Sequence, residues 1–524
     1  MKHYYKKILL VFFFLFQFSF SKAQWVTIPD FGFAFLLQTN YPFCMNGNML
    51  DTTCTSVVNA SYMNCSSGNI SDLTGIQYFD NLQILDCSGN SLTSLPNLPN
   101  SLLHLRCGGN NLTNLPNLPN NLEYLNCLGN PLTSLPLLPN GLDTLLCNAD
   151  YFSTLPPLPS NLIVLTCGGI ALDSIPPLPS SLKVFNCNSS TTLINLPTLP
   201  NSLVELYSEF CFSLNLPTSL PDSLRIFNCY GSDFTNLPFL PDSLKELNCR
   251  QNQLTNLPSL PPTLEYFNCV ENGIGFIPAL PSTLTELWCN SNLLTVVPVL
   301  PNSLFALGCA NNQLSSLPVL PPALWFLDCG SNPIITLPSL PKSIRRFFCA
   351  FSQILSVPEV PDSLITFEVN DNPQLLCLPK LNYVEVLKFF NTGIICLPNY
   401  GTVQISAPLL STLPLCNLFN SNGCDVYWNI SGKVYGDTNS NCTFETGEFG
   451  NPNMKLILDS AGTMIQQTYT VGEGLYSFDT DTGTYTYTVD TTDLPVLVTC
   501  PAAGFQTSVL TAIDSMDYDM DFGM

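Results

Sequence analysis

One stretch of the chain, residues 437–448, carries oxygen-bearing side chains at the spacing of a calcium-binding loop. It reads DTNSNCTFETGE. Calcium takes about six to eight oxygen ligands, and a twelve-residue loop supplies them from alternate positions, ending with a bidentate carboxylate. Cys442 stands at the sixth position, where glycine is usual. The spacing predicts calcium as a cofactor, with a plain polar hairpin loop as the alternative. The candidate ligands are Asp437, Asn439, Asn441, Thr443, Glu445 and Glu448.

A second candidate site consists of aromatic and charged residues at the outward positions of short predicted strands. Exposed aromatic side chains on a curved sheet are typical of protein or glycan recognition. The alternative is that aromatic residues simply favour strands. Six of the seven outward aromatic residues lie between residues 207 and 348, and the seventh is Tyr124; this crowding favours binding. The candidate residues of this concave face are Tyr207, Tyr230, Glu246, Arg250, Tyr266, Glu286, Trp288, Phe326, Arg346 and Phe348.

Many of the 23 cysteines recur at a fixed interval of mostly twenty residues, and Ser208 takes one missing place. Side chains on neighbouring strands are parallel and about 4.8 Å apart, whereas a disulfide needs converging Cβ atoms about 3.8 Å apart. A metal site needs ligands from several directions. The spacing therefore predicts reduced thiols buried in a core, where free cysteine packs as a small hydrophobe. These residues are Cys65, Cys87, Cys107, Cys127, Cys147, Cys167, Cys187, Cys229, Cys249, Cys269, Cys289, Cys309, Cys329 and Cys349.

Histidine is too scarce for most catalytic constellations. The chain has two, His3 and His104, whereas Ser-His-Asp, Cys-His and histidine-based zinc sites each need one in a specific context. We therefore expect a protein that is not an enzyme. One alternative is an enzyme that uses an acid pair such as Glu246 and Glu286 on glycans, although an open strip lacks the pocket that such a pair requires. Two further alternatives are an enzyme whose catalytic region is missing from this chain and a purely structural spacer.

The cysteines belong to a repeat of the form LxxLxCxxNxLTxLPxLPxS, as in LKELNCRQNQLTNLPSLPPT. This is the leucine-rich repeat pattern with cysteine in the third apolar position. Each repeat predicts a short strand, a buried asparagine that bonds to the backbone, and an extended or polyproline-like return, because proline excludes a helix there. Residues 59–415 are expected to form a repeat solenoid with parallel strands.

The chain begins with a predicted signal peptide, residues 1–23, which has a basic start, an apolar run and small residues at a cleavage site. Residues 24–58 are expected to cap the solenoid. Asp30 can begin a helix that runs to Gln38, and Cys44 and Cys54 are a candidate disulfide of an exported protein. No other segment is apolar enough to span a membrane.

Residues 425–524 differ in composition, and apolar and polar residues alternate in VYWNISGKVYG, MKLILDS, MIQQTYTV, LYSFDT, TYTYTVD and PVLVTC. Six short strands with turn signals predict an all-β sandwich. The sequence leaves open the redox states of Cys377, Cys396, Cys416, Cys424, Cys442 and Cys500.

The excess of acidic residues limits the kinds of partner that the chain can bind. The expected mature chain has 38 acidic and twelve basic residues, because the signal peptide contains four lysines and no acid. Such a chain is a poor partner for nucleic acid, and cations or basic proteins suit it better. Ligand identity and oligomeric state stay open.

The twenty-residue unit resembles the short bacterial leucine-rich repeats of the YopM and IpaH class over about 330 residues. The resemblance implies the solenoid fold but no ligase activity, since nothing after Pro414 looks like a ligase domain. The segment ISGKVYGDTNSNCTFETGEFGNPNMKLIL resembles the SdrD B-type, or Cna B-like, module of bacterial surface adhesins. In that module the calcium loop has the form DxNxDGxxDxGE, which corresponds to the six candidate ligands above.

Together these resemblances imply a secreted or outer-surface protein of a Gram-negative bacterium, similar to proteins that use type IX secretion. The usual C-terminal sorting domain is not evident, and the chain stops where a module boundary would fall. A truncated gene product is therefore an open alternative. We expect an adhesin-like recognition protein that binds protein or glycan through the concave face of the solenoid.

Overall fold

The computed structural model describes residues 24–147, 153–169, 172–362, 364–398, 402–413, 424, 430–478, 480, 483–492, 494–510, 517 and 519–524. The predicted signal peptide therefore lies outside the described residues, as does Cys416. The chain divides into two compact units, Met1–Asn252 and Gln253–Met524. No described helix is both long enough and apolar enough to cross a membrane.

The first unit begins with a cap of mixed structure. Helix α2 (Phe31–Asn40) starts where the sequence predicts, because the Asp30 carboxylate accepts a hydrogen bond from the Phe33 N–H at 2.8 Å. Its buried residues include Phe33 and Leu37. The sequence did not predict the small antiparallel sheet or the second helix of this cap. These are β1 (Trp25–Thr27), β2 (Met45–Asn46), β3 (Met49–Asp51) and α3 (Thr55–Val58).

Parallel strands follow in both units, one per repeat, and within each unit every strand pairs in register with the next along the chain. In the first unit they are β4 (Tyr62–Asn64), β5 (Ile84–Asp86), β6 (His104–Arg106), β7 (Tyr124–Asn126), β8 (Thr144–Leu146), β9 (Val164–Thr166), β10 (Val184–Asn186), β11 (Glu205–Tyr207), β12 (Ile226–Asn228) and β13 (Glu246–Asn248).

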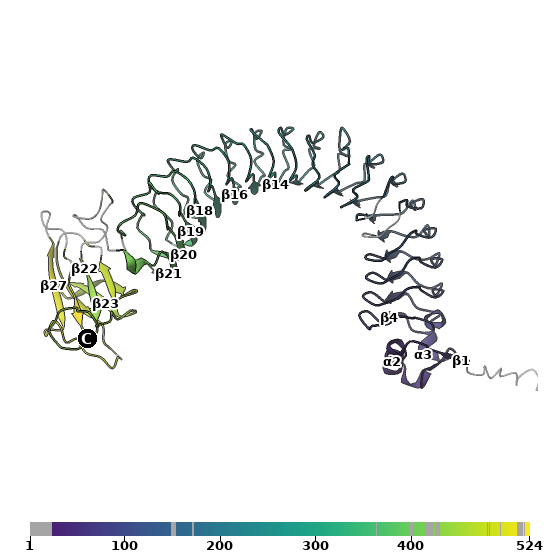
Figure 1. The fold of residues 1–524 in the computed structure, drawn as a ribbon, viewed down its shortest axis with the longest axis horizontal. Coiled ribbons are helices and arrows are strands. Elements are labelled where there is room, and N and C mark those ends of the chain that lie inside the picture. Colours follow the sequence, from purple (N-terminus) through teal and green to yellow (C-terminus); the bar gives the residue numbers. More distant parts are fainter. Residues whose placement is uncertain are drawn as a thin grey trace, which may run out of the picture. The chain divides into compact units, whose positions relative to one another are not determined.

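In the second unit the strands are β14 (Tyr266–Asn268), β15 (Glu286–Trp288), β16 (Ala306–Gly308), β17 (Phe326–Asp328), β18 (Arg346–Phe348), β19 (Leu364–Glu368), β20 (Tyr383–Lys388) and β21 (Thr402–Ala407). Within this unit the strands line the inner edge of a curved stack (Figure 1). Each unit's repeats thus form the expected parallel solenoid. Among the described residues of 60–413 the only helical segments are the short 3-10 turns η2 (Ile76–Tyr78) and η3 (Leu410–Thr412).

The repeat leucines and cysteines build the core. In the repeat around β5, Leu82, Leu85, Cys87 and Leu92 are fully buried. All fourteen ladder cysteines are buried thiols outside the disulfides, as the sequence predicts, and Cys211 is a fifteenth. A thiol can donate a weak hydrogen bond to the next strand, as Cys147 Sγ does to the Thr166 carbonyl oxygen at 3.4 Å. Burial raises the pKa of the Cys249 and Cys289 thiols to about 12, so these groups are protonated at neutral pH.

The repeat asparagine binds neighbouring turns together. Asn332 Nδ2 donates to the carbonyl oxygens of Cys309 and Cys329, both at 3.0 Å, and its Oδ1 accepts from the Leu314 N–H at 3.0 Å. The side chain is buried, so each bond satisfies backbone groups that water cannot reach. The predicted role of this asparagine is confirmed.

Some repeats of the first unit have no asparagine at this position, and in several of these cysteine or serine stands there instead. Cys211 Sγ donates to the Cys187 carbonyl oxygen at 3.2 Å, and Ser232 Oγ donates to the Ser208 carbonyl oxygen at 2.7 Å. Ser232 Oγ also accepts from the Cys211 N–H at 3.1 Å. Cys211 and Ser232 therefore keep part of the bonding of the regular repeats, whereas the buried Ser190 hydroxyl has no hydrogen-bond partner among the described residues.

The C-terminal part of the second unit contains two sheets. One has the order β25-β22-β28 and the other β24-β23-β26-β27. Their apolar residues form one core that includes Val434, Leu458, Tyr476 and Tyr487. The strands are β22 (Ile430–Tyr435), β23 (Lys455–Ser460), β24 (Thr463–Tyr469), β25 (Leu475–Phe478), β26 (Gly483–Val489), β27 (Phe505–Leu510) and β28 (Phe522–Gly523).

Two sequence expectations fail in this region. The predicted strand PVLVTC, residues 495–500, makes only an isolated bridge between Cys500 and Gly523. Pro495 and Pro501 both lack the N–H that a strand donates. The alternation revealed neither the short β28 nor β27, which is the sixth strand along this part of the chain. Its buried positions include the polar Ser508, while Phe505 and Val509 point to solvent.

Three disulfides are present among the described residues. Cys44–Cys54 staples the N-terminal cap, as predicted. The disulfides Cys377–Cys424 and Cys442–Cys500 show that four cysteines whose redox state the sequence left open are oxidised. Cys396 is also oxidised.

Candidate functional site

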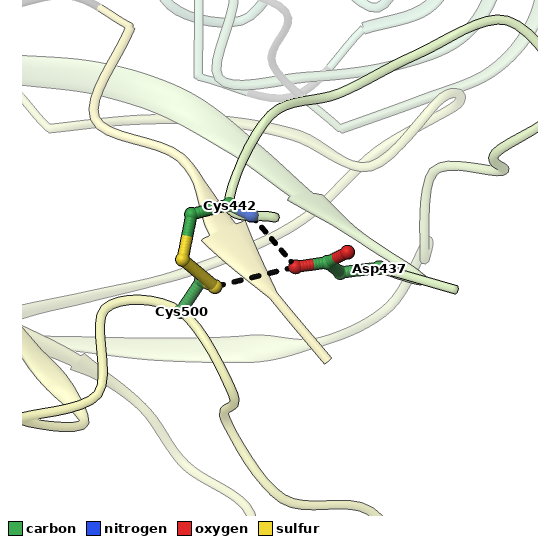
Figure 2. Close-up of side chains that lie close together, drawn as sticks. All are labelled: Asp437, Cys442 and Cys500. Atoms are coloured by element: carbon green, nitrogen blue, oxygen red, sulfur yellow. Dashed lines mark hydrogen bonds between the residues drawn. A yellow bond between two sulfur atoms is a disulfide. The ribbon is translucent and has the colours of Figure 1, made fainter. Parts of the chain in front are cut away.

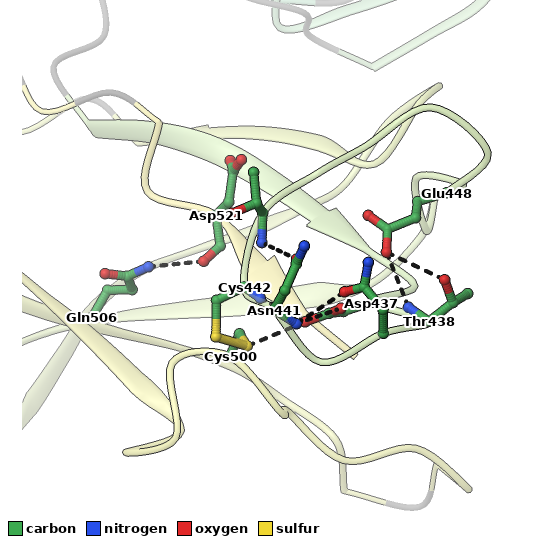
Figure 3. The surroundings of a disulfide bond; sticks show 10 residues. Asp437, Thr438, Asn441, Cys442, Glu448, Cys500, Gln506 and Asp521 are labelled. Atoms are coloured by element: carbon green, nitrogen blue, oxygen red, sulfur yellow. Dashed lines mark hydrogen bonds between the residues drawn. A yellow bond between two sulfur atoms is a disulfide. The ribbon is translucent and has the colours of Figure 1, made fainter.

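The candidate calcium loop starts directly after β22 and lies against the last residues of the chain. The Asp437 N–H donates to the Met524 carbonyl oxygen at 3.2 Å. Asp437 Oδ2 accepts from the Cys442 N–H at 3.1 Å, and its Oδ1 accepts from the Asn441 N–H at 3.3 Å (Figures 2 and 3). The first candidate ligand therefore closes the loop on itself.

The final candidate ligand, Glu448, holds the two ends of the loop. Its Oε1 accepts from the Thr438 N–H and its Oε2 from the Glu445 N–H, both at 3.0 Å. Asn439 and Asn441 both donate from their amide nitrogens to Glu445 at 3.1 Å and 2.9 Å. The exposed fractions of Asp437 and Glu448 are only 7% and 8%.

Cys442 departs from the glycine expected at the sixth position, and its geometry explains how it is accommodated. Its φ is +64°, the left-handed conformation that glycine adopts most easily. The disulfide to Cys500 joins this turn to a segment 58 residues further along the chain (Figure 3). Cys442 thus supplies the sharp turn of a glycine together with a covalent tie.

The loop suits a hard cation better than a soft one. Asp437, Cys442 and Cys500 lie close enough to surround an ion, but both sulfurs belong to a disulfide and cannot act as thiolate ligands. The 3.2 Å contact between Cys500 Sγ and Asp437 Oδ2 (Figure 2) is accordingly not a thiol hydrogen bond. No described lysine or arginine forms an ion pair with the three loop carboxylates. Carboxylate and amide oxygens without a cationic partner fit calcium.

The second candidate site is the strand face, which we define as the surface formed by the first and third residue of each repeat strand and their immediate neighbours. In the first unit, the Tyr207 hydroxyl donates to Glu205 Oε2 at 2.9 Å. Burial of the hydroxyl, together with its hydrogen bond to the Glu205 carboxylate, raises the pKa of Tyr207 to about 12. Tyr230 lies 4.8 Å from the Phe210 ring, with the Arg250 guanidinium 5.8 Å from its centroid. Glu246 is exposed on β13. Tyr230 and Arg250 follow the ladder cysteine and lie outside the strands.

In the second unit the strand face carries a row of aromatic rings. Trp288 lies 5.2 Å from Phe326, and Phe326 lies 5.6 Å from Phe348, between ring centroids. Trp288 Nε1 donates to Glu286 Oε2 at 2.9 Å, which fixes the indole. Tyr266 lies beside Glu286 in register but joins none of these ring contacts.

A second pair of rings was missed at the sequence level. Phe305 and Trp325 stack with centroids 5.6 Å apart and planes 9° apart, and the Arg346 guanidinium lies 5.6 Å from the Trp325 centroid. Phe305 is 47% exposed. The two residues are separated by one repeat and occupy the position before the strand, so a comparison of that position across repeats could have found them. In the second unit the structure thus brings together four of the predicted residues, Trp288, Phe326, Arg346 and Phe348, and adds Phe305 and Trp325.

Comparison with known proteins supports the fold. No family model matches the chain, and no curated protein matches it. YopM from Yersinia enterocolitica WA-314 is 28% identical, with a TM-score of 0.52, over 64% of this chain and 86% of that one. A leucine-rich effector protein YopM from Yersinia pestis is 29% identical, with a TM-score of 0.45, over 62% and 84%. The functional domain of InlJ from Listeria monocytogenes, described as including a cysteine ladder, is 20% identical, with a TM-score of 0.44, over 89% and 96%. The first of these, with the repeat pattern, assigns the described repeats to the leucine-rich repeat fold.

Proposed function

We propose that this chain is a secreted or cell-surface recognition protein that binds a protein partner through the strand face. The observation that carries the proposal is the row formed by the partly exposed Trp288, Phe326 and Phe348 on one face of the sheet. Partly exposed aromatic rings supply large contact areas at low entropic cost and dominate the energetics of many protein interfaces. Stacked repeats hold the rings in register, so the surface is organised before a partner arrives.

The test is an array of extracellular proteins and glycans probed with the purified chain. We expect binding to protein targets and an affinity loss of about tenfold or more when Phe326 and Phe348 are both replaced by alanine. Val319→Ala is the matched control, because Val319 is an exposed apolar residue outside the strands. Binding to glycans alone would reject a protein partner. Equal loss from the control would reject the strand face as the site.

We further propose that calcium binds residues 437–448 and stabilises a C-terminal β-sandwich of the SdrD B type. Two nearly buried carboxylates, Asp437 and Glu448, support this, because burial without a cationic partner is costly for a charged group. Asp437 also contacts the final strand: a Cβ atom at Gly523 would lie 2.8 Å from Asp437 Cβ. An ion at this point would therefore link the loop to the rest of the module.

The proposed location rests on the sequence of residues 1–23 and on the oxidised cysteines. Disulfides such as Cys44–Cys54 and Cys442–Cys500 persist in oxidising compartments. A non-enzymatic role is consistent with the open strand face and the single histidine beyond residue 23. N-terminal sequencing of the protein from its native culture would test the location, since a start at residue 24 is expected.

A further inference from the structure

We propose that Asp328 and the three rings around it form a binding site for a cationic side chain, so that the partner presents an exposed arginine or lysine to the strand face of the second unit. The inference rests on the proposed function, because it specifies the chemistry of a partner at that same surface. Asp328 was not among the sequence candidates.

The register places Asp328 between the rings. Asp328 pairs with Gly308 on β16 and with Phe348 on β18. It lies on the same face as Phe326, two residues earlier on β17, because alternate residues of a strand share a face. Trp288 pairs with Gly308 on the other side, and its ring lies close enough to Gly308 to cover it. The carboxylate is therefore flanked by Trp288, Phe326 and Phe348.

Asp328 lacks a cationic partner among the described residues. Its carboxylate accepts one long hydrogen bond, from the Gly330 N–H at 3.3 Å, and no described lysine or arginine forms an ion pair with it. Arg346 lies on the adjacent strand, but its guanidinium lies over Trp325. Lys388 pairs with Glu368 at 2.8 Å. Burial raises the pKa of Asp328, and the nearby Glu368 charge adds to this effect.

The aromatic rings and the Asp328 carboxylate both favour a cationic ligand. The face of an aromatic ring attracts a cation within about 6 Å, and a half-buried carboxylate gains most from a charged donor. Glu286, which fixes Trp288, adds a second carboxylate to this surface. Guanidinium is the better match, since its plane stacks on rings while its edge donates to a carboxylate. The acidic chain as a whole also suits a basic partner.

The test uses N-acetyl-arginine amide as the probe and N-acetyl-citrulline amide as its neutral control of almost the same shape. Binding to the full chain is followed by saturation-transfer NMR. We expect arginine to bind about fivefold more tightly than citrulline, and this preference to vanish in Asp328→Asn. Phe348→Leu, which keeps an apolar side chain but removes the ring, should weaken arginine binding without affecting citrulline.

Equal affinities for the two probes, a preference retained in Asp328→Asn, or no binding of arginine at millimolar concentration would each overturn the cation site. Circular dichroism would verify that both variants remain folded. If proteins bind the strand face while the probes do not differ, this inference fails and the proposed function stands. If arginine binds with the expected preference but no protein target requires Phe326 and Phe348, the proposed function fails and the cation site stands.

Discussion

Trp288 lies across Gly308. A Cβ atom on Gly308 would be 2.6 Å from Cε3 of the Trp288 indole, which is closer than two carbon atoms can approach. The strand between Trp288 and Phe326 contributes only the small Ala306 and Gly308 to this face, and the indole lies over Gly308. The position of the Trp288 ring therefore depends on the absence of a side chain at residue 308.

Replacing Gly308 by alanine should displace the Trp288 ring. Overpacking of this kind typically costs about 1–3 kcal/mol. We expect a lower midpoint of urea denaturation and a change in tryptophan fluorescence. Gly275→Ala is the matched control, because nothing lies within 4 Å of its added Cβ atom. Identical denaturation and fluorescence for both variants would show that Trp288 does not occupy this position.

The ladder cysteines should be unreactive in the folded protein. Burial shields the thiols and raises the pKa of Cys249 and Cys289, whereas the thiolate is the reactive form. Titration with a thiol reagent should find few reactive groups in native buffer and about fifteen in denaturant. A much lower number in denaturant would mean that the ladder is oxidised and that its packing role is wrong.

Asp328→Asn should stabilise the chain at neutral pH. Burial raises the pKa of Asp328 in the folded state, so the folded protein binds this proton more tightly than the unfolded protein. The resulting stability is complete below the pKa of the unfolded aspartate, about 4, and is lost as pH rises through the folded pKa. The difference between Asp328→Asn and wild type should accordingly shrink as pH falls through the folded pKa, and it should have disappeared below about 4. Exposed Glu359→Gln is the control, and an asparagine variant that is less stable at neutral pH would contradict the expectation.

Calcium should protect residues 430–524 selectively. Binding to the folded state alone adds about 2.7 kcal/mol at a hundredfold excess over Kd. Hydrogen exchange of the full chain should therefore slow in this region, relative to chelator, and stay unchanged between residues 60 and 398. Glu448→Gln should remove most of the effect, because the twelfth position supplies two oxygens. Equal exchange in calcium and in chelator would leave the loop a polar turn.

The repeat made most of the fold predictable. Leucine, cysteine and asparagine recur in phase, and each has one physical role in a stacked strand, so strands such as β5 and β17 follow directly from the pattern. The failures lie where the pattern stops. Residues 495–500 alternate correctly, but Pro495 at the start of the segment and Pro501 just after it lack the N–H that a strand donates. Strand β27 buries Ser508, whose hydroxyl lies 3.0 Å from that of Tyr487. The pairing of Cys377 with Cys424 cannot be read from spacing alone.

The candidate sites were predictable to different extents. The candidate oxygen ligands of the loop could be named from the sequence because their spacing is local, but the Cys442–Cys500 disulfide joins distant segments. On the strand face, Trp288 and Phe326 were found as outward residues. Their contact across two strands depends on Gly308, and the roles of Phe305, Trp325 and Asp328 appear only when neighbouring repeats are compared position by position.

Hydrogen exchange of the chain with a bound protein target shows whether the strand face is the binding surface. We expect slower exchange in peptides that contain Trp288, Phe326 and Phe348, and little change in the proline-rich segments such as residues 315–321. Slower exchange confined to the proline-rich segments, with the three strands unchanged, would contradict it.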